Sequence, residues 1–303
     1  MRLGFMVQGA DGGSLDGFLQ EVREAKEAGG STMWVSQIFG FDALTAIAVA
    51  GREVSGIEFG TAVVPTYPRH PMALAQQALT VQALIGDRLC LGIGLSHQIV
   101  VELMWGLSFE KPVRHMREYL AVLLPLLDGA PVQHEGEAFT VRGGISVPKA
   151  ARPQVLVAAL GEQMLRLTGA VADGTSTWCV GPSVLRDYTI PTLRQAAADA
   201  GRPEPRVVVG LPVAVTDDVD AVKALTAERL AVYDTLPSYK TMMDKEGVGG
   251  PADLAIAGTE AEVRDRLQEL VSIGVTDFNA VVAARNPEER ARTLAVLTDV
   301  TSR

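Results

Sequence analysis

The chain has 303 residues, of which 48% are hydrophobic, and its formal net charge at pH 7 is −9. So acidic a chain lacks the basic stripe that a nucleic-acid surface needs, and it holds no uninterrupted apolar run of about 18 residues that would span a membrane. The N-terminus begins with a strand pattern and not with a charged segment and an apolar signal core. We therefore expect a cytoplasmic protein that binds neither nucleic acid nor membrane.

Strand patterns alternate with helix patterns along the whole chain. The expected strands are 2–8, 32–37, 57–64, 88–95, 154–160, 174–180, 206–215 and 276–283. The expected helices are 14–28, 41–54, 71–85, 112–127, 161–172, 183–200, 259–273 and 287–300. This alternation predicts a parallel sheet, and eight of each is the number in a TIM barrel. We therefore expect an α/β fold, a (β/α)8 barrel, with residues 1–303 as a single domain.

A doubly wound open sheet fits less well. It would need a glycine-rich fingerprint after the first strand, and the VQGADGGS at 7–14 lacks the GxGxxG spacing. Helix ends also carry their own signals in the barrel interpretation. Ser14, Thr259 and Asn286 are expected N-caps, and Gly86 and Gly274 suit the left-handed position that ends a helix.

Two segments interrupt the regular alternation. Residues 129–152 predict a short inserted hairpin, and residues 231–257, which contain Tyr233 and Tyr239, predict an irregular excursion. Long insertions on a compact scaffold are often lids, oligomer contacts or disordered segments. The sequence does not decide among these for 231–257.

The two cysteines, Cys90 and Cys179, both lie in apolar strand-like runs, where buried structural thiols are commoner than a disulfide or a metal pair. No HExxH, CxxC or clustered histidine pattern indicates a metal site, so we expect none. A GxSxG hydrolase elbow and a phosphate-binding P-loop are also missing from the sequence.

The first candidate site lies where the strand 154–160 meets its helix. The amides of Ala159, Leu160 and Gly161 would point outward at the helix N-terminus, where unpaired N–H groups and the helix dipole favour a phosphate. The alternative is that Gly161 only permits a tight turn.

The second candidate lies on the strand 88–95. Gly92 and Gly94 occupy alternate positions, so they point the same way and would let a flat ring approach. His97 follows the end of the strand, and its imidazole could donate a proton because its ordinary pKa lies near neutral pH. A helix cap or a solvated histidine is the other interpretation.

Several segments together carry a family resemblance. IEFGTAVVP at 57–65, RHP at 69–71 and GDRLCLGIGLSH at 86–97 resemble the third and fourth strands of luciferase-like flavin and deazaflavin oxidoreductases. The N-terminal MRLGFMVQ and the segments 155–174 and 259–279 agree with that family in order and spacing.

This resemblance implies coenzyme F420 as the cofactor, with FMN as the alternative, and a homodimer. It implies that residues 159–161 cradle the cofactor phosphate. It also implies a non-proline cis peptide at Ala62–Val63, with Val63 as a backstop behind the ring. His97 aligns with an acidic residue of the sugar-phosphate-oxidising relatives.

One departure from the family bears on the reaction. Ile38 stands where the sugar-phosphate-oxidising relatives place a catalytic histidine, and an isoleucine cannot accept a proton. Gln37 could still hydrogen-bond a ring edge or the substrate. His70 either positions the helix that begins at Pro71 or touches the cofactor, with the structural role favoured.

Two further histidines have weaker claims. His115 lies in a charged helical run, VRHMREYL, which predicts a surface face, and His134 lies in the inserted hairpin.

From these features we expect an F420-dependent oxidoreductase that transfers a hydride between reduced deazaflavin and a small organic substrate, with reduction favoured. An FMN-dependent luciferase-like monooxygenase and a non-catalytic cofactor-binding barrel are the alternatives.

Overall fold

The computed structural model describes residues 1–7, 13–148 and 150–301, and its centre is a closed barrel of eight parallel strands. Around the barrel they are β1 (Arg2–Met6), β2 (Thr32–Val35), β3 (Glu58–Thr61), β5 (Leu89–Gly94), β8 (Gln154–Val157), β9 (Gly174–Trp178), β10 (Arg206–Val215) and β12 (Asp277–Val282). The last strand, β12, pairs with β1 and closes the ring. The expected TIM barrel is confirmed. That residues 1–303 form a single domain stays a prediction.

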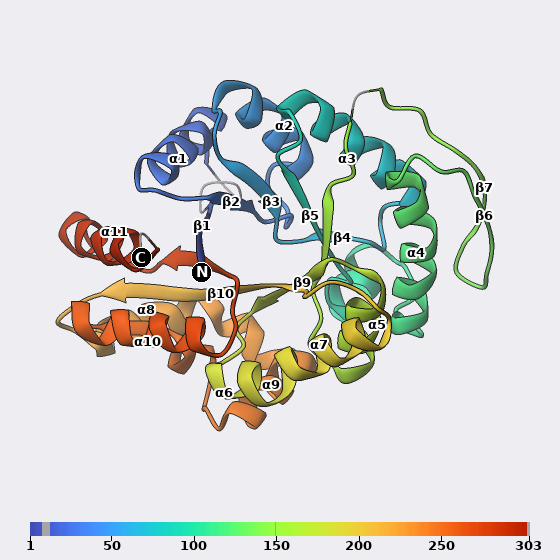
Figure 1. Ribbon diagram of the computed structural model, residues 1–303. Coiled ribbons are helices and arrows are strands. Elements are labelled where there is room, and N and C mark those ends of the chain that lie inside the picture. The colour runs from blue at the N-terminus through green and yellow to red at the C-terminus, as the bar shows by residue number, and fades with distance from the viewer. Residues whose placement is uncertain (8–12, 149, 302–303) are drawn as a thin grey trace.

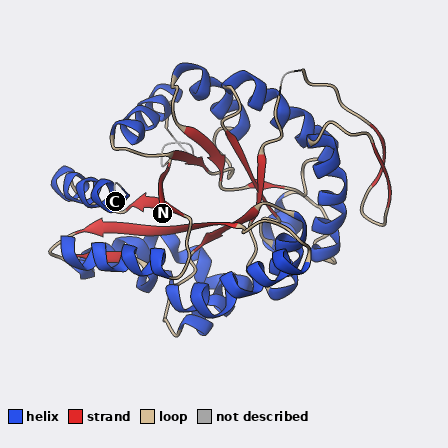
Figure 2. Cartoon of the chain, in the orientation of Figure 1, coloured by secondary structure: helices blue, strands red, loops and turns tan. Residues whose placement is uncertain are grey.

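Helices cover the outside of this barrel (Figures 1 and 2). The main ones are α1 (Leu15–Glu27), α2 (Ala43–Glu53), α3 (Pro71–Ile85), α4 (Pro112–Leu127), α5 (Glu162–Val171), α7 (Ile190–Asp199), α10 (Glu260–Ser272) and α11 (Pro287–Thr301). The predicted helix 183–200 is divided, because α6 (Pro182–Val184) and a π-helical turn at Leu185–Thr189 precede α7.

The predicted caps are present. The Ser14 side chain accepts the Gly17 amide at 3.0 Å, and Asn286 Oδ1 accepts the Glu289 amide at 2.9 Å. Thr259 forms a complete capping box with Glu262. Gly86 adopts a φ of 70°, which residues with a side chain rarely adopt, so a glycine there ends α3 without strain.

The barrel interior is charged at the amino ends of the strands and becomes apolar further along the strands, toward their carboxyl ends. Arg206 at the start of β10 donates to both oxygens of Asp277 on β12, at 3.0 and 2.6 Å, and to Glu58 on β3 at 2.7 Å. The Arg206 guanidinium also lies over the Trp34 ring at 5.5 Å. A buried apolar group follows, made of Trp34, Cys90, Leu156 and Val208.

The predicted strand 57–64 is broken in the structure. β3 ends at Thr61, and the short β4 (Val64–Pro65) resumes pairing with β5. Between them the Ala62–Val63 peptide is cis, as the resemblance implied. The inserted hairpin is confirmed as the antiparallel pair β6 (Val132–Glu135) and β7 (Thr140–Gly143).

The segment 231–257 is helical, and the expectation of an irregular excursion was wrong. It contains a 3-10 helix at Ala231–Thr235, α9 (Pro237–Glu246), a second 3-10 helix at Pro251–Leu254 and the start of β11 (Ile256–Gly258), which pairs with β10. The preceding α8 (Val219–Leu230) was not predicted. Because α8 buries only Val222 and Thr226, its sequence lacks the apolar stripe that marks a packed helix.

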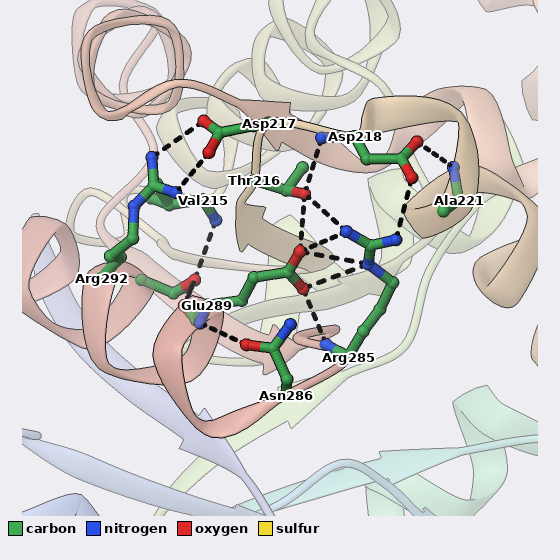
Figure 3. A network of polar contacts seen from close by, with 10 residues as sticks. Val215, Thr216, Asp217, Asp218, Ala221, Arg285, Asn286, Glu289 and Arg292 are labelled. Carbon is green, nitrogen blue, oxygen red and sulfur yellow. Dashed lines mark hydrogen bonds and ion pairs between the residues drawn. The ribbon is translucent and has the colours of Figure 1, made fainter.

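A polar network ties α11 to the end of β10 and to the N-terminus of α8 (Figure 3). Glu289 accepts hydrogen bonds from Thr216 at 2.8 Å and from the Arg285 amide at 2.9 Å. The Arg285 side chain also bridges to Asp218, the N-cap of α8, at 3.1 Å. Hydrogen bonds from Arg285 lower the pKa of the Glu289 carboxyl to about 2, so Glu289 stays ionised at neutral pH.

Both cysteines are free and buried, as expected. Burial raises the pKa of Cys90 to about 12 and raises that of Cys179 as well, so both stay protonated thiols at neutral pH. In the part of the chain that the structure describes, no helix is both long and apolar enough to cross a membrane.

Candidate active site

Glycines on two of the strands lie next to larger side chains toward the carboxyl end of the barrel. The strand register places Gly92 on β5 beside Leu156 on β8, and Gly210 on β10 beside Trp178 on β9. Ser176 follows the same interior row on β9, and Ala62 packs against the apolar group below it. Ligands of TIM barrels bind at this end, where loops from different strands meet.

The glycines of β5 make room for the chain at the cis peptide. A Cβ on Gly92 would lie 2.0 Å from the carbonyl oxygen of Thr61, and a Cβ on Gly94 would lie 2.6 Å from Cγ2 of Val63. The Thr61 hydroxyl donates to the Gly92 carbonyl at 2.7 Å and accepts from the Gly92 amide at 2.8 Å. Positions 92 and 94 therefore require glycine, in the first place, because the neighbouring strand approaches them closely.

His97 lies half-buried just beyond the end of β5. Ser96 before it has a φ of 62°, which turns the chain, and the His97 carbonyl accepts the amides of Val100 and Val101 at the start of a π-helical turn at Val100–Met104. Burial lowers the pKa of the His97 imidazole from its usual 6.5, so the ring is predominantly neutral at pH 7.

Aromatic side chains from three other segments surround His97. The centroids of Tyr239 (α9) and Tyr233 (the 3-10 helix before it) lie 5.8 and 6.3 Å from the imidazole centroid. Tyr233 also contacts Trp178 at the end of β9, at 6.2 Å, and Tyr239 at 4.8 Å. We call these four residues the aromatic wall. Of these four residues, only His97 was predicted from the sequence to belong to a site.

Glu246 at the end of α9 fixes this segment to the barrel. Its carboxylate accepts the amides of Ser183 at 3.1 Å and Val184 at 2.8 Å, both at the start of α6. A Cβ on Gly181 would lie 2.2 Å from the Glu246 carboxyl carbon, so a larger residue there would displace the carboxylate. The carboxylate therefore holds α9 against α6 (Figure 1).

The N-terminus of α5, by contrast, is open. Gly161 is its N-cap, with φ −80° and ψ 153°, and no side chain caps the helix. A Cβ on Gly161 would have nothing within 4 Å. The space beside Gly161 is therefore free, at the same barrel end as His97, and the first N–H groups of a helix have no partner within the helix, which suits a phosphate site.

Gln37 and His70 each cap a helix. Gln37 Oε1 accepts the Ala43 amide at 2.7 Å at the start of α2. His70 is the N-cap of α3, and its Nδ1 accepts the Met72 amide at 3.2 Å. The side chain of Ile38 is half-exposed in the loop after β2.

The prediction that His115 lies on a surface face was wrong. His115 is only 9% exposed, hydrogen-bonds the Thr66 hydroxyl at 3.0 Å and stacks on Tyr67 with centroids 4.0 Å apart. Phe139 of the inserted hairpin covers this side of α4, at 5.3 Å from the imidazole. Burial lowers the pKa of His115 to about 4. His134 lies on β6, 3.7 Å from the Glu118 carboxylate.

Sequence comparison identifies several relatives. The chain is 30% identical over 223 residues to an uncharacterized protein of Mycobacterium tuberculosis, and the match covers 69% of this chain and 66% of that protein, slightly less than two thirds of its length. It is 28% identical over 229 residues to a putative coenzyme F420-dependent oxidoreductase of the same organism, covering 70% and 66%. It is 25% identical over 287 residues to the 5,10-methylenetetrahydromethanopterin reductase of Methanolobus tindarius, covering 84% and 87%.

Solved structures share the fold. The coenzyme F420-dependent tetrahydromethanopterin reductase of Methanopyrus kandleri superposes with a TM-score of 0.80 at 21% identity, over 97% of both chains. The oxygenating constituent of 3,6-diketocamphane monooxygenase from Pseudomonas putida, in complex with FMN, superposes with a TM-score of 0.78 at 17% identity, over 99% of this chain and 97% of the other.

The family model for luciferase-like monooxygenases matches residues 1–277, which include all the candidate site residues named above. The chain therefore belongs to the luciferase-like monooxygenase family.

Proposed function

We propose that this enzyme is a coenzyme F420-dependent reductase that delivers a hydride to a small organic substrate. The observation that carries the proposal is the open N-terminus of α5 at Gly161, at the same barrel end as His97. The mycobacterial and archaeal relatives whose names specify F420 support the choice of cofactor.

The residues around this site fit a phosphorylated ring cofactor. We assign the phosphate to the amides of Ala159, Leu160 and Gly161, because the space beside Gly161 is free. We assign the ring to Ala62 and Val63, with Gly92 and Gly94 behind that bulge. Gln37 and His70 each use one acceptor atom to cap a helix, and we assign their remaining nitrogen atoms to ring or ribityl contacts.

When bound, the deazaflavin supplies a hydride, which is a two-electron reductant. His97 is the residue that holds a proton beside the substrate. Because burial keeps its imidazole neutral at pH 7, its N–H donates a hydrogen bond to the charge that develops on the substrate, and water supplies the proton that completes the reduction. Ile38 accepts no proton, so we favour reduction over alcohol oxidation.

An FMN-dependent monooxygenase is the second candidate, supported by the FMN-bound structural neighbour and by Ile38. The experiment that separates the two is titration of the purified protein with F420 and with FMN, followed by fluorescence. Micromolar F420 binding is the expected result. FMN binding together with substrate-dependent oxygen consumption, and no F420 binding, would establish the monooxygenase. Binding of either cofactor without turnover of any substrate would favour a non-catalytic barrel.

We also propose a homodimer. The family resemblance supports it, and the half-exposed to exposed Ile99, Leu103 and Met104 around the π-helical turn supply apolar surface. Light scattering after size exclusion should give twice the chain mass of 32.2 kDa, and a mass of one chain would exclude the dimer.

A further inference from the structure

We infer that the aromatic wall selects an uncharged, planar, unsaturated substrate, and that Tyr233 and Tyr239 are specificity-determining residues. This inference rests on the proposed function, because it concerns the same site. It begins from the packing of Tyr233 and Tyr239 against each other and against His97. Both tyrosines come from the segment 231–257, which lies outside the eight-strand ring and is fixed to α6 by Glu246.

The rings of the wall pack directly on one another. Tyr233 and Tyr239 meet edge to face, with an interplanar angle of 76°, and Tyr233 meets His97 at 87°. The rings therefore form one contiguous aromatic surface, against which a planar conjugated ligand can stack or make edge contacts.

Charge argues against an anionic substrate. The loops at the carboxyl end of the barrel, together with 231–255, contain five lysine or arginine residues: Arg69, Lys111, Lys240, Lys245 and Arg285. Arg69 is bound by Asp42 and Gln77, and Arg285 by Glu289 and Asp218. Lys111 pairs with Glu137, and Lys245 lies over the Tyr188 ring. Among the described residues of these loops, Lys240, which is exposed on α9, is the cation without a carboxylate or ring partner.

Apolar side chains stand exposed on the same loops. Ile38 follows β2 and Val232 precedes Tyr233; their exposed fractions are 51% and 56%. An apolar entrance with few available cations suits a neutral conjugated ring and disfavours a phosphorylated or carboxylated one.

The test uses three planar bicyclic probes of similar size: coumarin, coumarin-3-carboxylate and N-methylquinolinium. Binding is measured by calorimetry on the full chain, once without cofactor and once saturated with whichever cofactor binds. We expect coumarin to bind about tenfold more tightly than either charged probe.

The variants distinguish the contribution of each tyrosine ring to binding from that of its hydroxyl group. Tyr233→Leu and Tyr239→Leu should each weaken coumarin binding about fivefold, whereas Tyr233→Phe and Tyr239→Phe should stay within about twofold of the wild type. Lys240→Gln is the control and should leave coumarin binding unchanged. Circular dichroism of each variant establishes that it is folded.

Tighter binding of the carboxylate with its loss in Lys240→Gln, tighter binding of the cation, insensitivity to both leucine variants, or no binding of any probe would each overturn the inference. A failure of the proposed cofactor is distinguishable, because it would show in the F420 titration and leave the probe preference without cofactor intact.

Discussion

At the scale of single residues, His97 combines a position at the barrel mouth with a lowered pKa. We expect His97→Ala to reduce turnover by about 100-fold, because the hydrogen-bond donor is lost, while cofactor affinity changes little. Steady-state kinetics on the identified substrate, together with cofactor titration, measure the two effects separately. Turnover near the wild-type value would leave His97 as a lining residue only.

His115 gives a prediction about pH. Its folded-state pKa of about 4 lies below the usual 6.5, so the unfolded chain takes up a proton more readily than the folded one. The stability contributed by neutral His115 is complete above pH 6.5 and is lost as the pH falls toward 4. We expect this loss to be about 2–3 kcal/mol.

The check is urea unfolding at several pH values. His115→Gln should lose correspondingly less stability between pH 7 and pH 4 than the wild type, because it carries no titrating group. His70→Asn, which replaces an exposed imidazole and retains an N-cap, should follow the wild-type curve. Parallel curves for His115→Gln and the wild type would refute the assignment.

At the scale of elements, the contact between β3 and β5 depends on Gly92. A Cβ there would stand 2.0 Å from a backbone oxygen that cannot move without breaking the sheet. We expect Gly92→Ala to lower the unfolding free energy by at least about 2 kcal/mol. Gly161→Ala, where the added Cβ meets nothing, is the matched control for stability. A small effect at position 92 would mean that the two strands separate readily.

The open end of α5 gives the second element-scale prediction. Proline tolerates a φ near −80° but has no N–H, so Gly161→Pro removes one donor without straining the chain. We expect cofactor affinity to fall about fivefold or more. Gly161→Ala retains the donor and should bind within about twofold of the wild type. Equal cofactor affinities of folded Gly161→Pro and Gly161→Ala would show that the phosphate does not bind at this helix.

The elements differ in how far the sequence revealed them. The eight barrel strands and main helices were predictable because each buries an apolar pattern next to its own caps and glycines. α8 was not predicted because it buries few side chains, so its sequence has little hydrophobic periodicity. The open N-terminus of α5 could be predicted from the local sequence Ala-Leu-Gly, because the end of β8 and the start of α5 are adjacent in the chain.

The aromatic wall could not be read in that way. Its contacts join His97 to Tyr233 and Tyr239, which lie far from it in the sequence, and no local sequence pattern predicts such contacts. His115 was misjudged for a related reason: its charged neighbours in the sequence suggested solvent, whereas a hairpin from later in the chain covers it.

At the scale of the whole molecule, Arg206 links the amino ends of several strands. It joins β10 to β12 and β3, and its Nη1 also donates to Gln154 of β8 at 2.9 Å. Because Asp277 is almost fully buried, removing the guanidinium leaves its carboxylate with the Thr276 hydroxyl at 2.7 Å and the more distant Arg2 at 3.7 Å. We expect Arg206→Met to lower the unfolding free energy by about 3–5 kcal/mol.

The matched control is Arg186→Ala, which breaks an exposed pair with Asp187 and should leave the free energy of unfolding nearly unchanged. Urea unfolding of both variants compares them directly. A loss at Arg206 no larger than at Arg186 would show that the buried charges find other partners.

The way α9 is attached bears on how this protein can evolve. Segment 231–258 pairs with the sheet through the three residues of β11, and Glu246 at α6 and the tyrosines at the mouth also fix it in place. It contributes the buried side chains of Met242, Met243 and Leu254 to the main core. Substitutions at its exposed positions can therefore alter the surface presented at the mouth without disturbing that core, whereas exchange of the whole segment has to preserve its buried side chains as well.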